Sequence, residues 1–386
     1  MAVVRSLIFT TILGLLLFYI WRRLVRATGL RGRARIAATA GLVALVLPMI
    51  IVNLVRGGGP PKIDGVIAWP AFIGWALFGF LFFGVLVSDI ARLVVWLGRR
   101  ATRSPPMDPS RRQALARITG GVVGTAVVSH VGYGMVRALG EAELVDVPIT
   151  LAKLPKALDG FTIVQLSDLH VGGAIDRAFV ELVVDRANRL SPDLVALTGD
   201  IVDGPVGALK DRVAPFAQLR AAHGVYAVTG NHEYYAGADG WIDAISSHSV
   251  RYLRNQLVTI GGGSASFQLA GVDDHESRRY RGHGEDMKAA TAERDPDRAL
   301  VLLAHQPRQV FRAARHGVDL QLSGHTHGGQ IWPWHYIVKV QQKGMLAGRY
   351  LHQATQLYVT RGCGYWGPPV RLLAPLEITR VILRSA

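Results

Sequence analysis

Hydrophobic residues are arranged in two different ways along the chain. In the first third they form long runs at residues 7–21, 36–55 and 66–87, with a weaker, glycine-rich run at 118–136. A helix of about 20 apolar residues spans a bilayer core. We therefore predict a membrane region over residues 1–140 with about four transmembrane helices. Buried core helices are the alternative, but uncharged runs of this length are rare in soluble folds.

The rest of the chain has the pattern of an α/β domain. From about residue 145, short apolar runs alternate with longer segments of helical character, at 177–190, 207–222, 240–248 and 306–316. About 30 residues separate Asp168 from Asp200, and Asp200 from Asn231, which is the length of a βαβ unit. We predict a single globular domain over residues 145–386.

Charge is distributed unevenly between these two parts. The net charge of the chain is +15, and residues 1–144 carry 17 Lys and Arg against 5 Asp and Glu. Residues 145–386 carry 26 basic and 23 acidic side chains. The basic excess therefore flanks the apolar runs, as in membrane proteins, and does not form a nucleic-acid surface on the globular domain. We expect the lipid bilayer, and no nucleic acid, as a partner.

The arginines also predict an orientation in the membrane. They gather at residues 22–35 and 92–117, whereas the loop between the second and third runs holds only Arg56 and Lys62 around a Gly57–Pro61 turn. Loops rich in Lys and Arg stay on the cytoplasmic side. We therefore expect a multi-pass protein of a bacterial plasma membrane, with the Gly57–Pro61 turn and the globular domain outside the cytoplasm.

A short segment before the fourth run has two interpretations. Ser110-Arg-Arg-Gln-Ala-Leu115 resembles a twin-arginine export signal, because a basic pair precedes a moderately apolar stretch. Alternatively, Arg111 and Arg112 are ordinary cytoplasmic charges next to a membrane span. Both interpretations give the same topology. We see no convincing cleavage site after Val136 and expect the anchor to be retained.

Five apolar runs in the globular domain end in residue types that bind metals. These runs lead into Asp168-Leu-His170, Gly199-Asp200, Gly230-Asn231-His232, His305 and Gly324-His325-Thr-His327. Open α/β sheets place their sites at the carboxyl ends of strands. Carboxylates combined with imidazoles suit Mn, Fe or Zn. The single cysteine, Cys363, argues against a thiolate zinc site and is expected to be a packed small residue.

These ligand types indicate a reaction as well as a metal. A carboxylate such as Asp200 has two oxygens and can bridge two ions. A pair of divalent metals about 3.5–4 Å apart activates water and holds phosphate oxygens for in-line displacement. Each histidine taken alone is more often a surface or core residue than a ligand. It is the ordered set of five motifs that predicts a metal centre.

The five motifs, in this order, resemble those of the calcineurin-like metallophosphoesterase superfamily. The resemblance covers roughly residues 160–385 and is strongest with membrane-associated bacterial members, through Leu303-Ala-His-Gln-Pro307 and Ser323-Gly-His-Thr-His-Gly-Gly-Gln-Ile-Trp-Pro333. It implies a four-layer α/β/β/α sandwich with two divalent ions at one edge. The helical membrane region lies outside the part that resembles the superfamily.

The resemblance also implies a role for each residue. The first metal would be held by Asp168, His170 and His327, and the second by Asn231, His305 and His325, with Asp200 bridging them. His232 would stay free of metal and act on the phosphate as an acid. Glu233 is expected to orient its neighbours. His275 and Arg361 are further candidates for substrate contact.

The function expected from the sequence is that of a membrane-anchored dinuclear phosphohydrolase. By analogy with the membrane-associated members, the protein would cleave a phosphodiester or pyrophosphate. The membrane anchor favours a lipid-linked substrate. One alternative is a nuclease or nucleotide phosphodiesterase of the same superfamily, although the domain charge speaks against nucleic acid. The other alternative is a catalytically inactive membrane receptor with the same fold. The complete set of predicted metal ligands argues against it.

Overall fold

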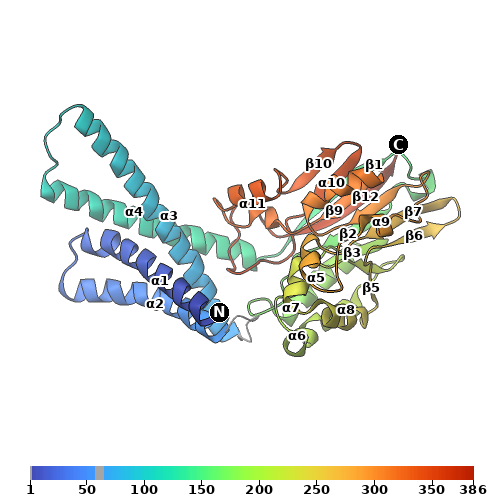
Figure 1. The fold of residues 1–386 in the computed structure, drawn as a ribbon, viewed down its shortest axis with the longest axis horizontal. Helices are drawn as coiled ribbons and strands as arrows, with labels where there is room; N and C mark the ends of the chain where they lie inside the picture. Colours follow the sequence, from blue (N-terminus) through green and yellow to red (C-terminus); the bar gives the residue numbers. More distant parts are fainter. Residues whose placement is uncertain (1, 57–64) are drawn as a thin grey trace. The chain divides into compact units, whose positions relative to one another are not determined.

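The structure of the protein, a computed structural model, describes residues 2–56 and 65–386 (Figure 1). The chain divides into two compact units. The first comprises residues 1–136 with 367–370, and the second comprises residues 137–366 with 371–386. The turn predicted at Gly57–Pro61 lies outside the described residues.

The described residues of the first unit form four long helices, drawn in blue to teal in Figure 1. They are α1 (Ala2–Trp21), continued by a π-helical turn at Arg22–Arg26, α2 (Gly32–Arg56), α3 (Gly65–Ala101) and α4 (Pro109–Leu139). Each contains a stretch long and apolar enough to cross a membrane. The helices α3 and α4 extend well beyond the apolar runs at 66–87 and 118–136, and α4 includes Arg111 and Arg112 in its first turn.

The outward faces of these helices are apolar. Only 11–28% of the most apolar window of each candidate span is buried within the protein, and side chains such as Leu7, Leu54 and Val128 are more than half exposed. Glycines bring the helix backbones together. A Cβ on Gly74 would lie 2.5 Å from the Leu45 carbonyl oxygen, a close approach typical of helices that pack in lipid. An apolar exterior is unfavourable in water, so these helices are not the core of a soluble domain.

The second unit contains two six-stranded sheets. In spatial order, the first has β1 (Glu143–Leu151), β12 (Glu377–Ser385), β2 (Thr162–Leu166), β3 (Leu194–Leu197), β4 (Val225–Ala227) and β5 (Val250–Tyr252). The second has β10 (Gly348–His352), β11 (Thr355–Val359), β9 (Leu320–Ser323), β8 (Leu300–Leu303), β7 (Ala265–Gly271) and β6 (Gln256–Gly262). Strands β2 to β5 are parallel, as are β7, β8, β9 and β11.

Helices cover the outer face of each sheet. The helices of this unit are α5 (Arg177–Arg189), α6 (Val206–Val213), α7 (Asn231–Ala236), α8 (Ala238–Ser246), α9 (Met287–Ala290), α10 (Val310–Ala313) and α11 (His335–Gln341), and those that pack on the sheets are α5, α6, α8, α9 and α10. One apolar cluster joins the two sheets, for example through Ile163, Leu269 and Val301. A second joins the first sheet to α5, α6 and α8, and a third joins the second sheet to α9 and α10. The predicted four-layer α/β/β/α sandwich is confirmed.

Two helices expected from the sequence are shorter than predicted. The segment predicted as a helix over 207–222 is α-helical only to Val213 and continues as a 3₁₀ turn over Ala214–Gln218, because Pro215 has no N–H to donate to the carbonyl four residues earlier. The segment 306–316 breaks into short 3₁₀ and α turns between Pro307 and Gly317. Both changes lie in the covering layers and leave the strand ends, where the metal-binding motifs stand, unchanged.

Candidate metal centre

The predicted ligands stand on loops at the carboxyl ends of five parallel strands. β2, β3 and β4 of the first sheet and β8 and β9 of the second lead into them. Backbone hydrogen bonds connect these loops, since the Asp168 and His170 amides donate to the Gly199 and Asp200 carbonyls at 3.0 and 3.1 Å. The two sheets therefore present their ligand loops to one common edge.

The first group consists of Asp168, His170 and His327. The Nε2 atoms of His170 and His327 lie 2.9 Å apart, and His327 Nε2 lies 3.4 Å from Asp168 Oδ1. Their ligand atoms fall within one sphere of metal-binding size. All three side chains are buried. Ring nitrogens and a carboxylate that converge out of reach of water are suited to sharing a cation.

The second group consists of Asp200, His305 and His325. His305 Nε2 lies 3.1 Å from Asp200 Oδ2 and 3.2 Å from His325 Nδ1. The other ring nitrogen of His305, Nδ1, donates to the Thr198 carbonyl at 2.7 Å. That bond leaves Nε2 as the ring atom that faces Asp200, which is the usual arrangement of a metal-binding imidazole.

Asn231 offers a direct test of whether a cation fits. The side chain is buried, and its Oδ1 has no hydrogen-bond partner among the described residues. Leaving such an oxygen unsatisfied costs about 1–3 kcal/mol, so native structures rarely do so. The neighbouring His232 amide donates to Asp200 Oδ1 at 2.9 Å, which ties this loop to the second group. A cation beside Asp200 would satisfy the amide oxygen, so the residues present fit a divalent metal.

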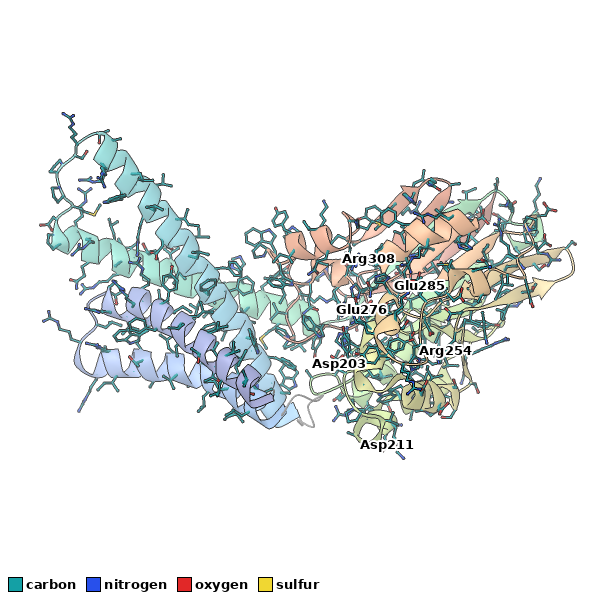
Figure 2. The ribbon with its side chains drawn as sticks, in the orientation of Figure 1. Asp203, Asp211, Arg254, Glu276, Glu285 and Arg308 are labelled. Carbon is teal, nitrogen blue, oxygen red and sulfur yellow. The ribbon has the colours of Figure 1, made fainter. Side chains whose placement is uncertain are left out.

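His232 is held by a residue whose role the sequence analysis did not identify. Asp203, labelled in Figure 2, follows β3, and its Oδ1 accepts hydrogen bonds from Nδ1 of His232 at 2.6 Å and Nδ1 of His170 at 2.8 Å. His232 Nε2 is left 4.0 Å from Asp200 Oδ2. The only signal in the sequence was the position of Asp203, three residues after Asp200.

Glu233 orders the backbone beneath the ligands. Its fully buried carboxylate accepts hydrogen bonds from the amides of Asp200 and Ile201, at 3.0 and 2.7 Å, and from Gly230 at 2.6 Å. It is not part of the candidate ligand groups found among the described residues. The carboxylate therefore holds the turn that presents Asp200, which is the orienting role expected of it.

The ligand loops adopt strained conformations. A positive φ is uncommon for residues other than glycine and costs of order 1–3 kcal/mol. It is found at five of the seven predicted ligands, Asp168, His170, Asp200, His325 and His327. Gly199 shows how tightly the loops pack, because a Cβ there would lie 2.7 Å from His305 Nδ1. Strain at so many neighbouring positions is typical of a functional site.

The pKa values of the two buried carboxylates, Asp168 and Asp200, are shifted in opposite directions. Burial, together with the charge of Asp200, raises the pKa of Asp168 against the opposing effect of His305. Burial also acts to raise the pKa of Asp200, but the imidazoles of His305 and His232 outweigh it and hold that pKa well below the usual range. Asp200 is therefore the more firmly ionised of the two, as a shared anionic ligand should be.

The histidines divide into neutral and charged members. Burial, followed by repulsion from His305, lowers the pKa of His325 to about 3, and burial with repulsion from His170 lowers that of His327. These rings are neutral at physiological pH and have a free lone pair. Burial opposes the charged form of His232, but Asp200 and Asp203 raise its pKa to about 9. In the absence of metal, the His232 ring is therefore protonated at neutral pH.

The two candidate substrate contacts lie outside these groups. His275 Nδ1 lies 3.5 Å from Glu285 Oε2. Arg361 donates through Nε to Glu377 at 2.6 Å and through a terminal nitrogen to Glu143 at 3.2 Å. Sequence reasoning also missed the fully buried Arg371, which contacts Nδ1 of His327 at 3.0 Å. An arginine this deeply buried had no recognisable pattern around it in the sequence.

Comparison with known proteins identifies the family to which the chain belongs. The profile of the calcineurin-like phosphoesterase family matches residues 161–329. An uncharacterized metallophosphoesterase of Helicobacter pylori strain J99 is 37% identical over 272 residues, covering 70% of this chain and 71% of that protein. An uncharacterized metallophosphoesterase of Bacillus subtilis is 33% identical over 288 residues, 72% of this chain and 98% of that protein.

One relative also resembles the helical unit. A Danio rerio protein described as a transmembrane protein with metallophosphoesterase domain is 32% identical over 383 residues, covering 95% of this chain and 86% of that protein. Together with the four apolar helices, this indicates membrane localisation. The chain belongs to the calcineurin-like phosphoesterase family and is a metal-dependent phosphoester hydrolase.

Proposed function

We propose that the protein is a dinuclear phosphohydrolase that cleaves a phosphodiester or pyrophosphate. The observation that supports this best is the position of Asp200. Its Oδ2 lies 3.1 Å from His305 Nε2 in one ligand group and 3.7 Å from His170 Nε2 in the other. A carboxylate between two groups of three ligands suits two ions rather than one. Asp168, His170 and His327 would hold the first ion, and Asn231, His305 and His325 the second.

Divalent metals bound there, whether Mn, Fe or Zn, would polarise a phosphoryl oxygen and lower the pKa of water. The protein side chains supply the remaining steps. Asp200 and Asp168 balance positive charge in a buried site. His232, held by Asp203 and protonated, faces the same space through Nε2 and donates a proton to the leaving oxygen.

The membrane helices indicate where the proposed reaction takes place and which substrates are near. Residues 1–140 would form a multi-pass anchor in a bacterial plasma membrane, and residues 145–386 a catalytic domain outside the cytoplasm, an orientation supported by the Arg-rich segments at 22–35 and 92–117. A catalytic domain kept beside a bilayer meets lipid-borne phosphates at high local concentration. We therefore propose a lipid-linked phosphodiester or pyrophosphate as the natural substrate.

The experiment is a panel of phosphoesters offered to the full chain in detergent or nanodiscs, loaded separately with Mn, Fe or Zn. The panel contains phosphomonoesters, phosphodiesters, nucleotides, single-stranded DNA and detergent-solubilised lipid diesters and pyrophosphates. We expect metal-dependent hydrolysis of diesters or pyrophosphates, lost in Asp200→Ala. Cleavage of DNA with a steep salt dependence would favour a nuclease instead, and inactivity with every metal would favour a receptor.

A further inference from the structure

A short segment next to the metal centre exposes an unusual amount of aromatic and aliphatic surface. We call residues 331–343, which contain α11, the aromatic segment. Its large apolar side chains are exposed at Trp332, Trp334, Tyr336, Ile337 and Val340, with 80% of Val340 accessible. None of the seven residues of α11, all of which the structure describes, is buried. The apolar side chains of this helix therefore contribute little to the protein core.

Such a segment needs an apolar partner. A helix of seven residues is too short to be stable in water by its own hydrogen bonds. Large exposed apolar patches on soluble domains mark surfaces that bind protein or membrane. Burial of these rings in a protein or membrane partner would remove their apolar surface from water.

The charge around the segment indicates which partner. Between Asp319 and Glu377 the sequence contains no Asp or Glu, although the globular domain as a whole is nearly balanced. Lys339, Lys343 and Arg349 are exposed within this stretch. A stretch of chain without acidic residues, with exposed lysines beside Trp and Tyr, matches the requirements of an anionic lipid headgroup layer, where amphipathic aromatic rings and basic side chains accumulate.

The segment is joined directly to the metal centre. Gly329, two residues after His327, packs so closely on α11 that a Cβ there would lie 2.2 Å from the His335 Cβ. The side chain of Gln330 exchanges two hydrogen bonds with the Trp366 backbone, at 2.8 and 2.9 Å. The half-exposed Trp366 ring has its centroid 6.2 Å from that of His232. Apolar and aromatic side chains thus continue from the segment to the edge of the site.

We propose that the aromatic segment lies in the headgroup region of the bilayer and presents membrane lipid to the metal centre. Its rings would enter the interface, while Lys339 and Lys343 would pair with anionic headgroups. A bilayer is always within reach, because only residues 140–142 separate α4 from β1. The docking surface stands independently of the reaction, whereas the delivery of lipid substrate rests on the proposed function.

The docking surface is tested with a fluorescent reporter on the full chain in nanodiscs containing anionic lipid. Cys363, the one native cysteine, is buried, so an environment-sensitive label can be attached selectively to Val340→Cys. Leu182→Cys on α5 is the matched control, an exposed apolar position on another face of the domain. We expect lipids bearing a quencher in the headgroup or upper chain to quench the label at 340 and leave the label at 182 bright.

Two results would overturn the docking surface. Equal or absent quenching at both positions means that the segment does not contact lipid. The label at 340 could instead be shielded already in detergent and cross-link to another copy or to the chain's own helices. That result means that protein covers the segment.

The delivery of substrate is tested by comparing two activities of each variant. The ratio of hydrolysis of a phosphodiester lipid embedded in the nanodisc to hydrolysis of bis(p-nitrophenyl) phosphate should fall at least about tenfold in Lys339→Glu/Lys343→Glu, because each lysine contributes to anionic lipid binding. Lys210→Glu on α6 is the control. An unchanged ratio overturns lipid delivery, and inactivity of the native chain on both substrates refutes the proposed function without affecting the quenching result.

Discussion

The carboxylate of Asp203 accepts a hydrogen bond from Nδ1 of His232 at 2.6 Å. The same oxygen accepts one from Nδ1 of His170 at 2.8 Å. One acidic residue therefore orients both an expected metal ligand and the expected proton donor, and leaves the Nε2 atom of each ring directed at Asp200. Positioning of this kind should affect metal affinity and turnover together.

Replacing Asp203 tests this coupling. In Asp203→Ala both rings lose their fixed tautomer and orientation, and such partners of metal ligands contribute about 10–100-fold to metal affinity or activity. We expect a loss in that range in kcat/KM and a matching decrease in metal affinity measured by titration. Asp211→Ala, at an exposed acid on α6 (Figure 2), is the control and should change neither quantity. An unaffected metal affinity in Asp203→Ala would show that His170 is positioned by other contacts.

Two adjacent residues, Asn231 and His232, should behave differently. Asn231→Ala removes the buried oxygen that has no hydrogen-bond partner in the described part of the chain, and it should lower metal content. His232→Asn should retain metal but lose about 10²–10⁴-fold in turnover, mostly in kcat, because a general acid contributes that much. The loss should shrink for nitrophenyl esters, whose leaving groups need no proton. The assignment is refuted if His232→Asn loses a metal while Asn231→Ala does not.

Asp200 is expected to be the most sensitive ligand. Asp200→Ala removes the carboxylate that lies between the two groups, so both ions lose a ligand and the surrounding imidazoles lose their counter-charge. We expect most of the activity to disappear and the metal content of the purified protein to decrease, as measured by elemental analysis. Normal metal occupancy together with normal turnover would contradict the bridging role.

Metal removal should lower the stability of the globular domain. A metal at 100 times its dissociation constant stabilises the folded state by about 2.7 kcal/mol, which corresponds to about 5–10 °C in Tm for a domain of roughly 240 residues. We expect a chelator to lower Tm by this amount and added metal to restore it. In Asp200→Ala the shift should be much smaller. If neither a chelator nor added metal changes the Tm of the native protein, no metal is bound at this site.

The membrane orientation can be tested with a fused reporter. A reporter that is active only outside the cytoplasm, placed after Leu144, should be active because the Arg-rich segments at 22–35 and 92–117 keep their loops inside. Activity of a cytoplasmic reporter at the same point would reverse the orientation. Arg111→Lys/Arg112→Lys preserves charge, so loss of export in this variant would identify a twin-arginine signal, and normal export would identify ordinary topological charge.

The sequence alone predicted the two-part organisation and the class of fold, for local physical reasons. A run such as residues 66–87 requires an apolar medium wherever the rest of the chain lies. Short buried strands such as Leu194–Leu197, each followed by a polar turn, indicate a parallel sheet with its polar residues at one edge. The ligand types and their order could be read in the same way, because residue type and distance along the chain are local properties.

Only the tertiary structure decided which of these residues meet. Asp203 contacts His170 and His232, which lie 33 and 29 residues away in the chain, and Arg371 contacts His327 across 44 residues. Likewise, the expected substrate contact Arg361 pairs with Glu377 and Glu143. Such contacts depend on how two sheets and their loops pack in space, and no local pattern of residues encodes the distance between segments that come together only on folding.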